Sequence, residues 1–370
     1  MAKYVKTEQG YIEMPSFAPA PFKPEGKSYL TFSSPKNFTL KVTNATKKWD
    51  GTIEYFASDK TWTAWDGTTT LSAVADDGEY VLYLRGTGNT VITGGDTAGI
   101  WVISGTNIKC IGNIDNLLDY ATVESGNHPT MANNCYQYMF QGCTSLISAP
   151  ELPATTLANN CYNSMFFDCT SLTQAPSLPA TTLAISCYAY MFAGCASLTK
   201  APALPATTLA NNCYQYMFQG CTSLISAPEL PATTLADFCY YGMFAGCTLK
   251  LSKTQTGEYN QAYRIPTTGD GITAREALNN MFPKILNNGG ALVMTPKINT
   301  TYYLSTDNMI VRDTEVATLN GYVGSMIDVA IGEYADTAEY IIPSSTTGST
   351  KKFKITVDDS GALTATEITQ

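Results

Sequence analysis

The sequence predicts a multidomain α+β protein: an N-terminal β-sandwich, a solenoid of 26-residue repeats, and a small C-terminal module of a helix and a β-hairpin. Three observations predict this fold class. Residues 132–249 contain four copies of one 26-residue unit, without insertion or deletion, and part of a fifth. Residues 25–108 are short β-type runs separated by turns, and residues 312–370 join an apolar 3-4 pattern to a hairpin pattern. We expect an extended arm over 1–24 and the solenoid with its caps over 109–311, because a fixed period of about 20–50 residues is typical of stacked repeats.

The composition argues against several functions. Only 14% of the residues are charged and the net charge is −9, so nucleic-acid binding is not expected, because neutralising phosphates requires clustered Lys and Arg. His128 is the single histidine, which removes histidine-rich metal sites, and we expect no cofactor. No apolar run reaches the roughly 18 residues of a membrane span. The first residues also lack the apolar core of a secretory signal, so we expect neither membrane insertion nor export.

Residues 25–108 are expected to form an immunoglobulin-like β-sandwich. The strand-like runs are SYLTFS, NFTLKV, TIEYFA, TWTAW, TTLSAV, EYVLYLRG, TVITG and GIWVIS, and turns such as Asp66-Gly67 and Asp77-Gly78 separate them. The prolines of residues 1–24 predict an extended arm whose aromatic residues serve as docking anchors. These anchors are Tyr4, Tyr11, Phe17 and Phe22.

Each repeat divides into two halves. Apolar residues of the first half follow the spacing i, i+1, i+4, i+5, i+8, which predicts one stripe on a short helix; in the first copy they are Cys135, Tyr136, Met139, Phe140 and Cys143. In the second half, residues 145–149 alternate as a short strand that Pro150 and Pro153 end. Stacked copies would place strands ~4.8 Å apart and helices ~8–10 Å apart. We therefore expect the stack to curve with its strands on the inside.

The repeat motif MF-x-x-C-T-S-L-x-x-A-P-x-L-P-A-T-T-L-A-x-x-C-Y resembles the BspA-like leucine-rich repeats of gut bacteria and their phages. The resemblance covers residues 132–249 strongly. Residues 28–118 look like the β-domain that often precedes such repeats, and residues 250–311 look like their usual C-terminal cap. Within that cap Thr273–Glu276 reads as a capping box that starts a helix.

Ten of the eleven cysteines occupy two fixed positions of the repeat. The two positions are eight residues apart, ~12 Å along a helix, which is too far for a disulfide. No CxxC motif is present, so zinc is not expected. We therefore predict two ladders of reduced, buried thiols that act as small hydrophobic groups.

The positions that vary between otherwise constant copies predict a solvent-exposed binding surface, since solenoids present such rows as an extended face. Rows of Tyr with Asn and Gln make an adaptable contact surface; tolerated surface variation without function is the competing interpretation. The candidate residues are Gln137, Tyr138, Ser148, Glu151, Asn163, Gln174, Tyr190, Lys200, Gln215, Tyr216, Ser226 and Glu229.

Residues 312–370 carry an apolar seam of about two heptads, followed by a hairpin over Lys352–Val357 and Ala362–Ile368. This module resembles the terminal module of phage fibre proteins. We expect a homotrimer held by the seam with help from the rest of the chain. The seam residues are Val316, Leu319, Val323, Met326 and Ala330.

We do not expect an enzyme. Glycoside hydrolysis needs a positioned pair of carboxylates, and the repeats hold few acidic residues on an uninterrupted period; these are Glu151, Asp168, Glu229 and Asp237. His128 lies in the turn Gly126–Thr130 and is interpreted as a surface residue rather than a catalytic base.

The resemblance implies a phage virion structural protein, either a fibre or a capsid or tail decoration. It would be assembled in the bacterial cytoplasm, would contact other virion proteins and would bind a host-surface protein or glycan. A bacterial cell-surface adhesin of the same family is the alternative, and a glycan depolymerase is the less favoured third. The arm over 1–24 is the preferred attachment to the particle, and the C-terminal module is the competing one.

Overall fold

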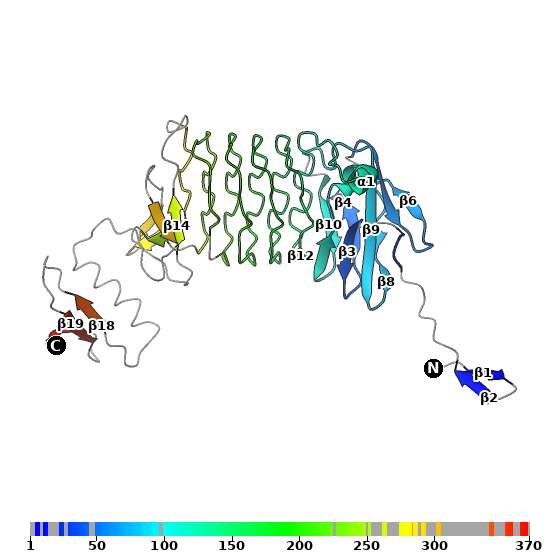
Figure 1. The fold of residues 1–370 in the computed structure, drawn as a ribbon, viewed down its shortest axis with the longest axis horizontal. Helices are drawn as coiled ribbons and strands as arrows, with labels where there is room; N and C mark the ends of the chain where they lie inside the picture. Colours follow the sequence, from blue (N-terminus) through cyan, green and yellow to red (C-terminus); the bar gives the residue numbers. More distant parts are fainter. Residues whose placement is uncertain are drawn as a thin grey trace. The chain divides into compact units, whose positions relative to one another are not determined.

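The structure is a computed structural model that describes side chains for residues 22–25, 29–43, 49–95, 99–224, 227–248 and 274–282, and only the backbone for the strands outside these ranges. The chain divides into two compact units, Met1–Asp313 and Thr314–Gln370. Its secondary structure is mostly β-sheet, and the described residues contain one helix, α1 (Asn116–Glu124) (Figure 1).

Two sheets precede and meet the repeats. The larger has the order β12-β11-β3-β9-β5-β6, with β8 also paired to β9. Its strands are β3 (Leu30–Ser34), β5 (Thr52–Phe56), β6 (Trp62–Trp65), β8 (Val74–Asp76), β9 (Glu79–Thr87), β11 (Ile108–Ile111) and β12 (Leu146–Ser148). The smaller has the order β10-β4-β7, with β4 (Thr39–Val42), β7 (Leu71–Ser72) and β10 (Trp101–Ser104). All pairs are antiparallel except β11 with β12, which is parallel.

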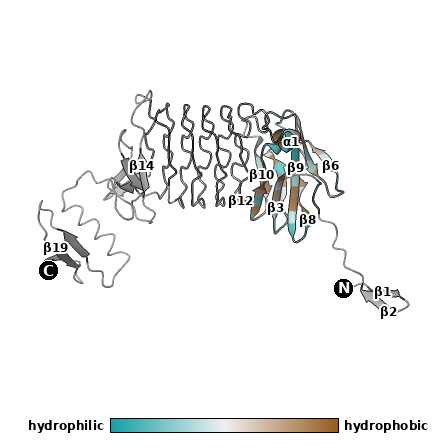
Figure 2. Cartoon of the chain, viewed as in Figure 1, coloured by the Kyte–Doolittle hydropathy of each residue, from teal (hydrophilic) through white to brown (hydrophobic). Residues whose placement is uncertain are grey.

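Both sheets contribute to one buried core. Phe32 and Leu82 of the larger sheet and Leu40 of the smaller sheet are at most 1% exposed. The strands owe this to their alternating pattern, which points every second side chain to one face, and Figure 2 shows hydrophobic and hydrophilic segments mixed along them. Trp65 and Trp101 meet edge to face with ring centroids 5.4 Å apart. The core continues without a break into the first repeat.

One expected strand is not a strand. Residues 90–94 instead run along the first repeat, where the N–H groups of Ile92 and Thr93 both donate to the carbonyl of Cys135, at 2.9 and 3.0 Å. Farther along, the N–H of Trp101 donates to the carbonyl of Met139 and the N–H of Ile108 to that of Ser145. This stretch therefore takes the place of a preceding copy and covers the start of the repeats.

The helix expected in each repeat is wrong. Residues 133–142 and their counterparts form consecutive turns, seen as the green loops of Figure 1. Every second N–H donates to the next copy: Tyr136 to the carbonyl of Cys161 at 2.8 Å, and Phe140 to that of Met165 at 2.9 Å. The N–H groups between them close turns within the copy, as when Met139 donates to the carbonyl of Tyr136 at 3.1 Å. The copies are thus joined through the main chain, which an α-helix would not allow, since its N–H groups bond internally.

The turns repeat every four residues. In the first copy a positive φ occurs at Asn134 (60°), Tyr138 (63°) and Gly142 (72°). Between these positions two side chains point inward and two outward, so Cys135 and Tyr136 are buried whereas Gln137 and Tyr138 are half-buried. A period of four and the helical period of 3.6 produce the same apolar spacing over nine residues, and this is why the pattern resembled a helix.

Two aromatic ladders run through the stack. The Tyr136 position is filled by stacked tyrosines with centroids 5.6 to 5.9 Å apart, and the Phe140 position by stacked phenylalanines 5.6 to 5.9 Å apart. These spacings replace the expected ~8–10 Å of a helical layer. The stack was expected to curve because helices on one side would be spaced more widely than strands on the other. Without helices, that argument for curvature does not hold.

The expected parallel sheet is also mostly missing. Beyond β12, the described copies are linked on that side by single parallel bridges, Ser148 with Gln174 and Thr182 with Thr208. Two prolines follow Ser148 and two follow Gln174 within five residues, in the first copy Pro150 and Pro153, and they have no N–H to donate to a ladder. The main-chain bonds between copies therefore lie chiefly on the side formed by the consecutive turns, residues 133–142 and their counterparts, which we call the turn side.

A sixth partial copy closes the described stack. The N–H of Phe238 donates to the carbonyl of Arg275 at 2.9 Å, and the N–H of Phe244 donates to that of Met281 at 2.7 Å. The helix expected to start at the capping box Thr273–Glu276 is wrong, because residues 275–280 are turns and Glu276 has a φ of 51°. Thr273 lies outside the described residues.

The arm does not run as one extended segment, because its first part folds back on itself. β1 (Tyr4–Thr7) and β2 (Gly10–Glu13) pair as an antiparallel hairpin. Phe22, expected to be free for docking, is 6% exposed and packs on Phe56 at 5.2 Å. Its N–H also donates to Oδ1 of Asp76 at 2.8 Å. Phe22 therefore fixes the arm to the larger sheet and is not available as an anchor.

The remaining strands form three small antiparallel sheets. The first unit has β13-β17-β14 and β15-β16, and the second has β18-β19-β20. Their bounds are β13 (Leu251–Ser252), β14 (Gln261–Arg264), β15 (Lys284–Asn287), β16 (Gly290–Val293), β17 (Thr301–Leu304), β18 (Tyr340–Pro343), β19 (Lys352–Val357) and β20 (Leu363–Ile368). The pairing of β19 with β20 is the hairpin expected for these residues. The five seam residues from Val316 to Ala330 lie outside the described residues.

Candidate binding surface

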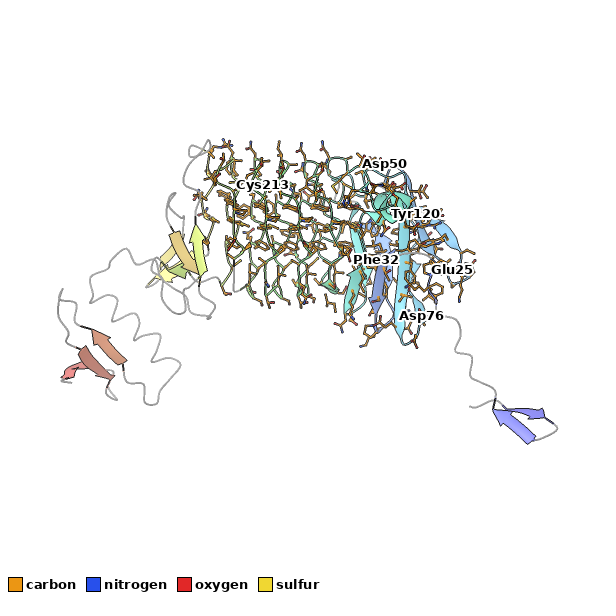
Figure 3. The ribbon with its side chains drawn as sticks, in the orientation of Figure 1. Glu25, Phe32, Asp50, Asp76, Tyr120 and Cys213 are labelled. Atoms are coloured by element: carbon orange, nitrogen blue, oxygen red, sulfur yellow. The ribbon has the colours of Figure 1, made fainter. Side chains whose placement is uncertain are left out.

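The inward cysteines form ladders of free, buried thiols, as predicted. All eleven cysteines are free and buried. In the second ladder each Sγ donates to a main-chain oxygen of the preceding copy, for example Cys169 to Phe140 at 3.1 Å, and in the first copy Cys143 to Trp101 at 3.0 Å. Burial raises the pKa of each thiol, for Cys161 to about 12. Cys213, labelled in Figure 3, is fully buried within the stack. These thiols act as packing groups within the stack.

The predicted surface residues fall into two sets. On the side of the single bridges, Glu151, Gln174, Lys200 and Glu229 are exposed and Ser148 is half-buried, while Ser226 lies outside the described residues. On the turn side all six predicted residues are half-buried: Gln137, Tyr138, Asn163, Tyr190, Gln215 and Tyr216. Two members of these turn-side rows, Ser164 and Ala189, are buried, at 6% and 1% exposed. All positions of these rows were expected to face solvent. Packing inside the stack therefore constrains the residue at some of them.

Four half-buried rings meet on the turn side and form what we call the aromatic patch: Tyr190, Tyr216, Phe238 and Tyr241. Tyr190 and Tyr216 stack with centroids 5.0 Å apart. Tyr241 meets Tyr216 edge to face at 5.1 Å and meets Phe238 at 5.7 Å. The patch is a continuous row of rings supplied by the third, fourth and fifth copies.

The sequence analysis missed Phe238 and Tyr241. In the fifth copy Tyr241-Gly242 replaces the Gln-Tyr of the fourth copy, so the tyrosine moves one place along the repeat. Gly242 has a φ of 60°, and a Cβ there would meet the ring of Tyr216. A glycine directly after an extra tyrosine was the available signal, because it makes room for the ring of the neighbouring copy.

Charged groups gather at one end of the patch. The guanidinium of Arg275 lies 4.7 Å from the ring centroid of Phe238, and the N–H of Arg275 donates to Oδ1 of Asp237 at 2.8 Å. Burial raises the pKa of Tyr216, and Tyr241 and the Glu276 carboxylate raise it further. Burial likewise raises the pKa of Tyr190. Both phenols are therefore neutral at physiological pH and can donate hydrogen bonds.

Tyr138 occupies the same position in the first copy as Tyr216 in the fourth. These two copies have identical sequences over 132–157 and 210–235. The next copy offers Ser164 beside Tyr138 but Gly242, with Tyr241 before it, beside Tyr216. The predicted tyrosine row is therefore interrupted at Ser164, and only its later part forms the patch.

A shallow pocket of about 280 Å³ lies where the β10–β11 turn meets the first two copies. Its lining carries hydroxyl groups and one amide and no aromatic or charged side chain. The lining residues are Gly105, Thr106, Asn107, Thr144, Ser145 and Ser171. It can accept a small polar group but offers no ring or charge to orient one.

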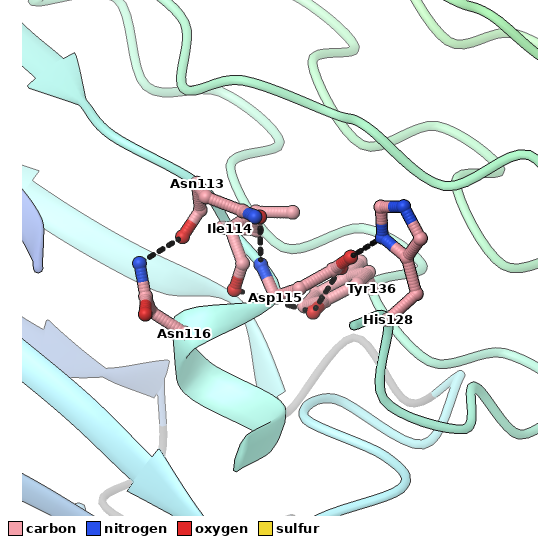
Figure 4. Close-up of polar contacts among 6 residues, drawn as sticks. All are labelled: Asn113, Ile114, Asp115, Asn116, His128 and Tyr136. Atoms are coloured by element: carbon pink, nitrogen blue, oxygen red, sulfur yellow. Dashed lines mark hydrogen bonds and ion pairs between the residues drawn. The ribbon is translucent and has the colours of Figure 1, made fainter. Parts of the chain in front are cut away.

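His128 lies at the junction of α1 and the first copy and is more than half exposed, in the turn where the sequence placed it. Its Nδ1 is 3.6 Å from Oδ2 of Asp115, whose side chain is 2% exposed, while His128 itself is 51% exposed (Figure 4). The hydroxyl of Tyr136 lies 3.3 Å from the carbonyl of Ile114 and 3.4 Å from Oδ1 of Asp115. Burial raises the pKa of Asp115, although the hydrogen bonds from His128 and Tyr136 oppose the shift. The contacts tie the turn before the first copy to the start of α1.

Within the described residues, no group of three or more His, Cys, Asp or Glu side chains is placed to hold a metal ion. No helix in the described part of the chain has the length and apolar character to cross a membrane. The chain matches no family model, and no curated protein or solved structure is detectably similar to it.

Proposed function

We propose that the chain is a phage virion structural protein, a fibre or a decoration of the capsid or tail, whose repeats bind a host-surface protein or glycan. In this proposal residues 109–311 are a BspA-like leucine-rich-repeat solenoid with its caps and the two sheets before it are a β-sandwich. Residues 313–333 hold a homotrimer, and other virion proteins are further partners. The protein has no catalytic role and belongs to the virion.

One observation supports a display function above the others: the side chains of the stacked core are constant, and most of the variation between copies lies at exposed or half-buried positions. The inward Cys, Tyr, Met and Phe positions are constant across the first four copies, and they stack into ladders. At an outward position the same copies carry Ser148, Gln174, Lys200 and Ser226. Because main-chain bonds already join the copies, the outward side chains are free to serve contact rather than folding.

A cell-surface adhesin of the same family is the alternative, since it would use the same outward rows. A glycan depolymerase is less favoured, because it needs a positioned carboxylate pair, and Glu151 and Glu229 sit at equivalent positions three copies apart.

Immunogold labelling of purified particles and of bacterial cells, with one antibody against this chain, tests the proposal. We expect label on particles, and we expect the purified chain to bind host cells. Label on cells grown without phage would support the adhesin instead. A chain that labels neither and binds no cells would refute both.

A further inference from the structure

We propose that the aromatic patch of Tyr190, Tyr216, Phe238 and Tyr241 is a subsite for a glycan chain, whose sugar rings lie against the tyrosine rings. This inference rests on the proposed display function and identifies which part of the surface makes contact, and with which class of ligand.

The patch is held rigidly by the main chain. Tyr190, Tyr216 and Phe238 have φ values of 55°, 51° and 54°. The left-handed region is unfavourable for such residues by about 1–2 kcal/mol each, so these conformations need support from their surroundings. That support comes from bonds to the next copy: the N–H of Tyr190 donates to the carbonyl of Gln215 at 2.8 Å, that of Tyr216 to Tyr241 at 2.8 Å, and that of Phe238 to Arg275 at 2.9 Å. A rigid site loses little conformational freedom when a ligand binds.

The size of the patch favours a thin, extended ligand. A fully covered aromatic side chain buries about 150–250 Å², so four half-buried rings offer on the order of 300 Å². A folded protein partner buries about 800 Å² on each side of a stable interface. The patch alone is therefore too small for a folded protein, but it can take a chain one sugar wide.

The chemistry of the patch favours a glycan over a peptide. The patch supplies apolar ring surface and the tyrosine hydroxyls, and the turn before Tyr216 adds two half-buried amide residues, Asn212 and Gln215. A sugar presents both matching features, C–H faces that pack on rings and hydroxyls that bond to hydroxyls and amides. Arg275, Asp237 and Glu276 stand at one end only, so most of the row is uncharged.

Tyr138 supplies a matched control, because the copies that carry Tyr138 and Tyr216 are identical in sequence and differ only in their neighbours. We would measure binding of the full chain, Tyr216→Ala and Tyr138→Ala to an array of immobilised oligosaccharides from bacterial capsules and lipopolysaccharides. A peptide array would be probed in parallel. Thermal unfolding would establish that both variants are folded.

We expect the wild type to bind at least one array glycan, Tyr216→Ala to bind it about tenfold more weakly, which corresponds to ~1.4 kcal/mol, and Tyr138→Ala to bind it unchanged. Tyr216→Phe should retain most of the binding, because the ring remains. Equal losses in the two alanine variants, no loss in either, binding only to peptides, or no glycan bound would each overturn the inference. If Tyr216→Ala fails to fold, Tyr241→Ala tests the same prediction.

Binding to host cells separates this inference from the proposed function. If Tyr216→Ala binds cells as well as the wild type does, the patch is not the contact and the display function stands. If the wild type neither binds cells nor labels particles, the proposed function itself fails.

Discussion

Replacing Gly242 by alanine should destabilise the repeats more than the same change four residues later. Gly242 is buried, its φ is 60°, and an added Cβ would meet the ring of Tyr216 in the copy before it. Gly246 has a φ of 77°, but a Cβ there would lie 3.4 Å from the N atom of Gly220, an ordinary contact. The two glycines thus share the backbone constraint and differ in the space around them.

The expected magnitudes follow from this difference. An alanine in the left-handed region costs about 1–2 kcal/mol of unfolding free energy, and this is the whole effect expected for Gly246→Ala. Forcing a methyl group into packed space adds about 1–3 kcal/mol, so Gly242→Ala should lose ~2–5 kcal/mol in total. The extra loss is the contact with Tyr216, and removing that ring should recover it.

Urea unfolding followed by circular dichroism measures these losses on the wild type, on each single variant and on the Gly242→Ala/Tyr216→Ala double variant. The midpoint should fall furthest for Gly242→Ala, and the double variant should be more stable than the sum of its single changes implies. Equal losses for Gly242→Ala and Gly246→Ala, or strict additivity in the double variant, would refute the packing argument.

Three further predictions concern other parts of the chain. The eleven thiols should react slowly with a thiol reagent in the native chain and fully in denaturant, because burial raises their pKa; rapid native labelling of most of them would contradict this. Burial also raises the pKa of Asp115, so the folded chain retains a proton that the unfolded chain has lost, and this contribution to stability falls as pH rises above about 4. Asp115→Asn should therefore gain in stability relative to the wild type as pH increases, measured by thermal unfolding across pH; a constant difference would count against it. Truncation to residues 1–311 should convert a trimer to a monomer in light scattering, because the predicted seam is removed; an unchanged oligomer would place the interface elsewhere.

The sequence alone determined the parts of this fold that depend on local pattern. The period and bounds of the repeats, the identity of the inward residues and the burial of the cysteines followed from composition at fixed positions. The pairing of Lys352–Val357 with Leu363–Ile368 followed from a turn between two alternating runs. Most strand runs of the first 108 residues were found for the same reason, since a half-buried strand needs only its own alternation of side chains.

The tertiary structure decided what depends on a neighbour. Whether the N–H of Tyr136 bonds within its copy or to Cys161 cannot be read from one copy, because the apolar spacing is the same in both cases. Likewise the aromatic patch required Tyr241 of one copy to meet Tyr216 of another, and the arm is fixed by Phe22 against Phe56, 34 positions later in the chain. Each of these choices is settled by the free energy of a contact between residues far apart in sequence, and local propensity carries no information about it.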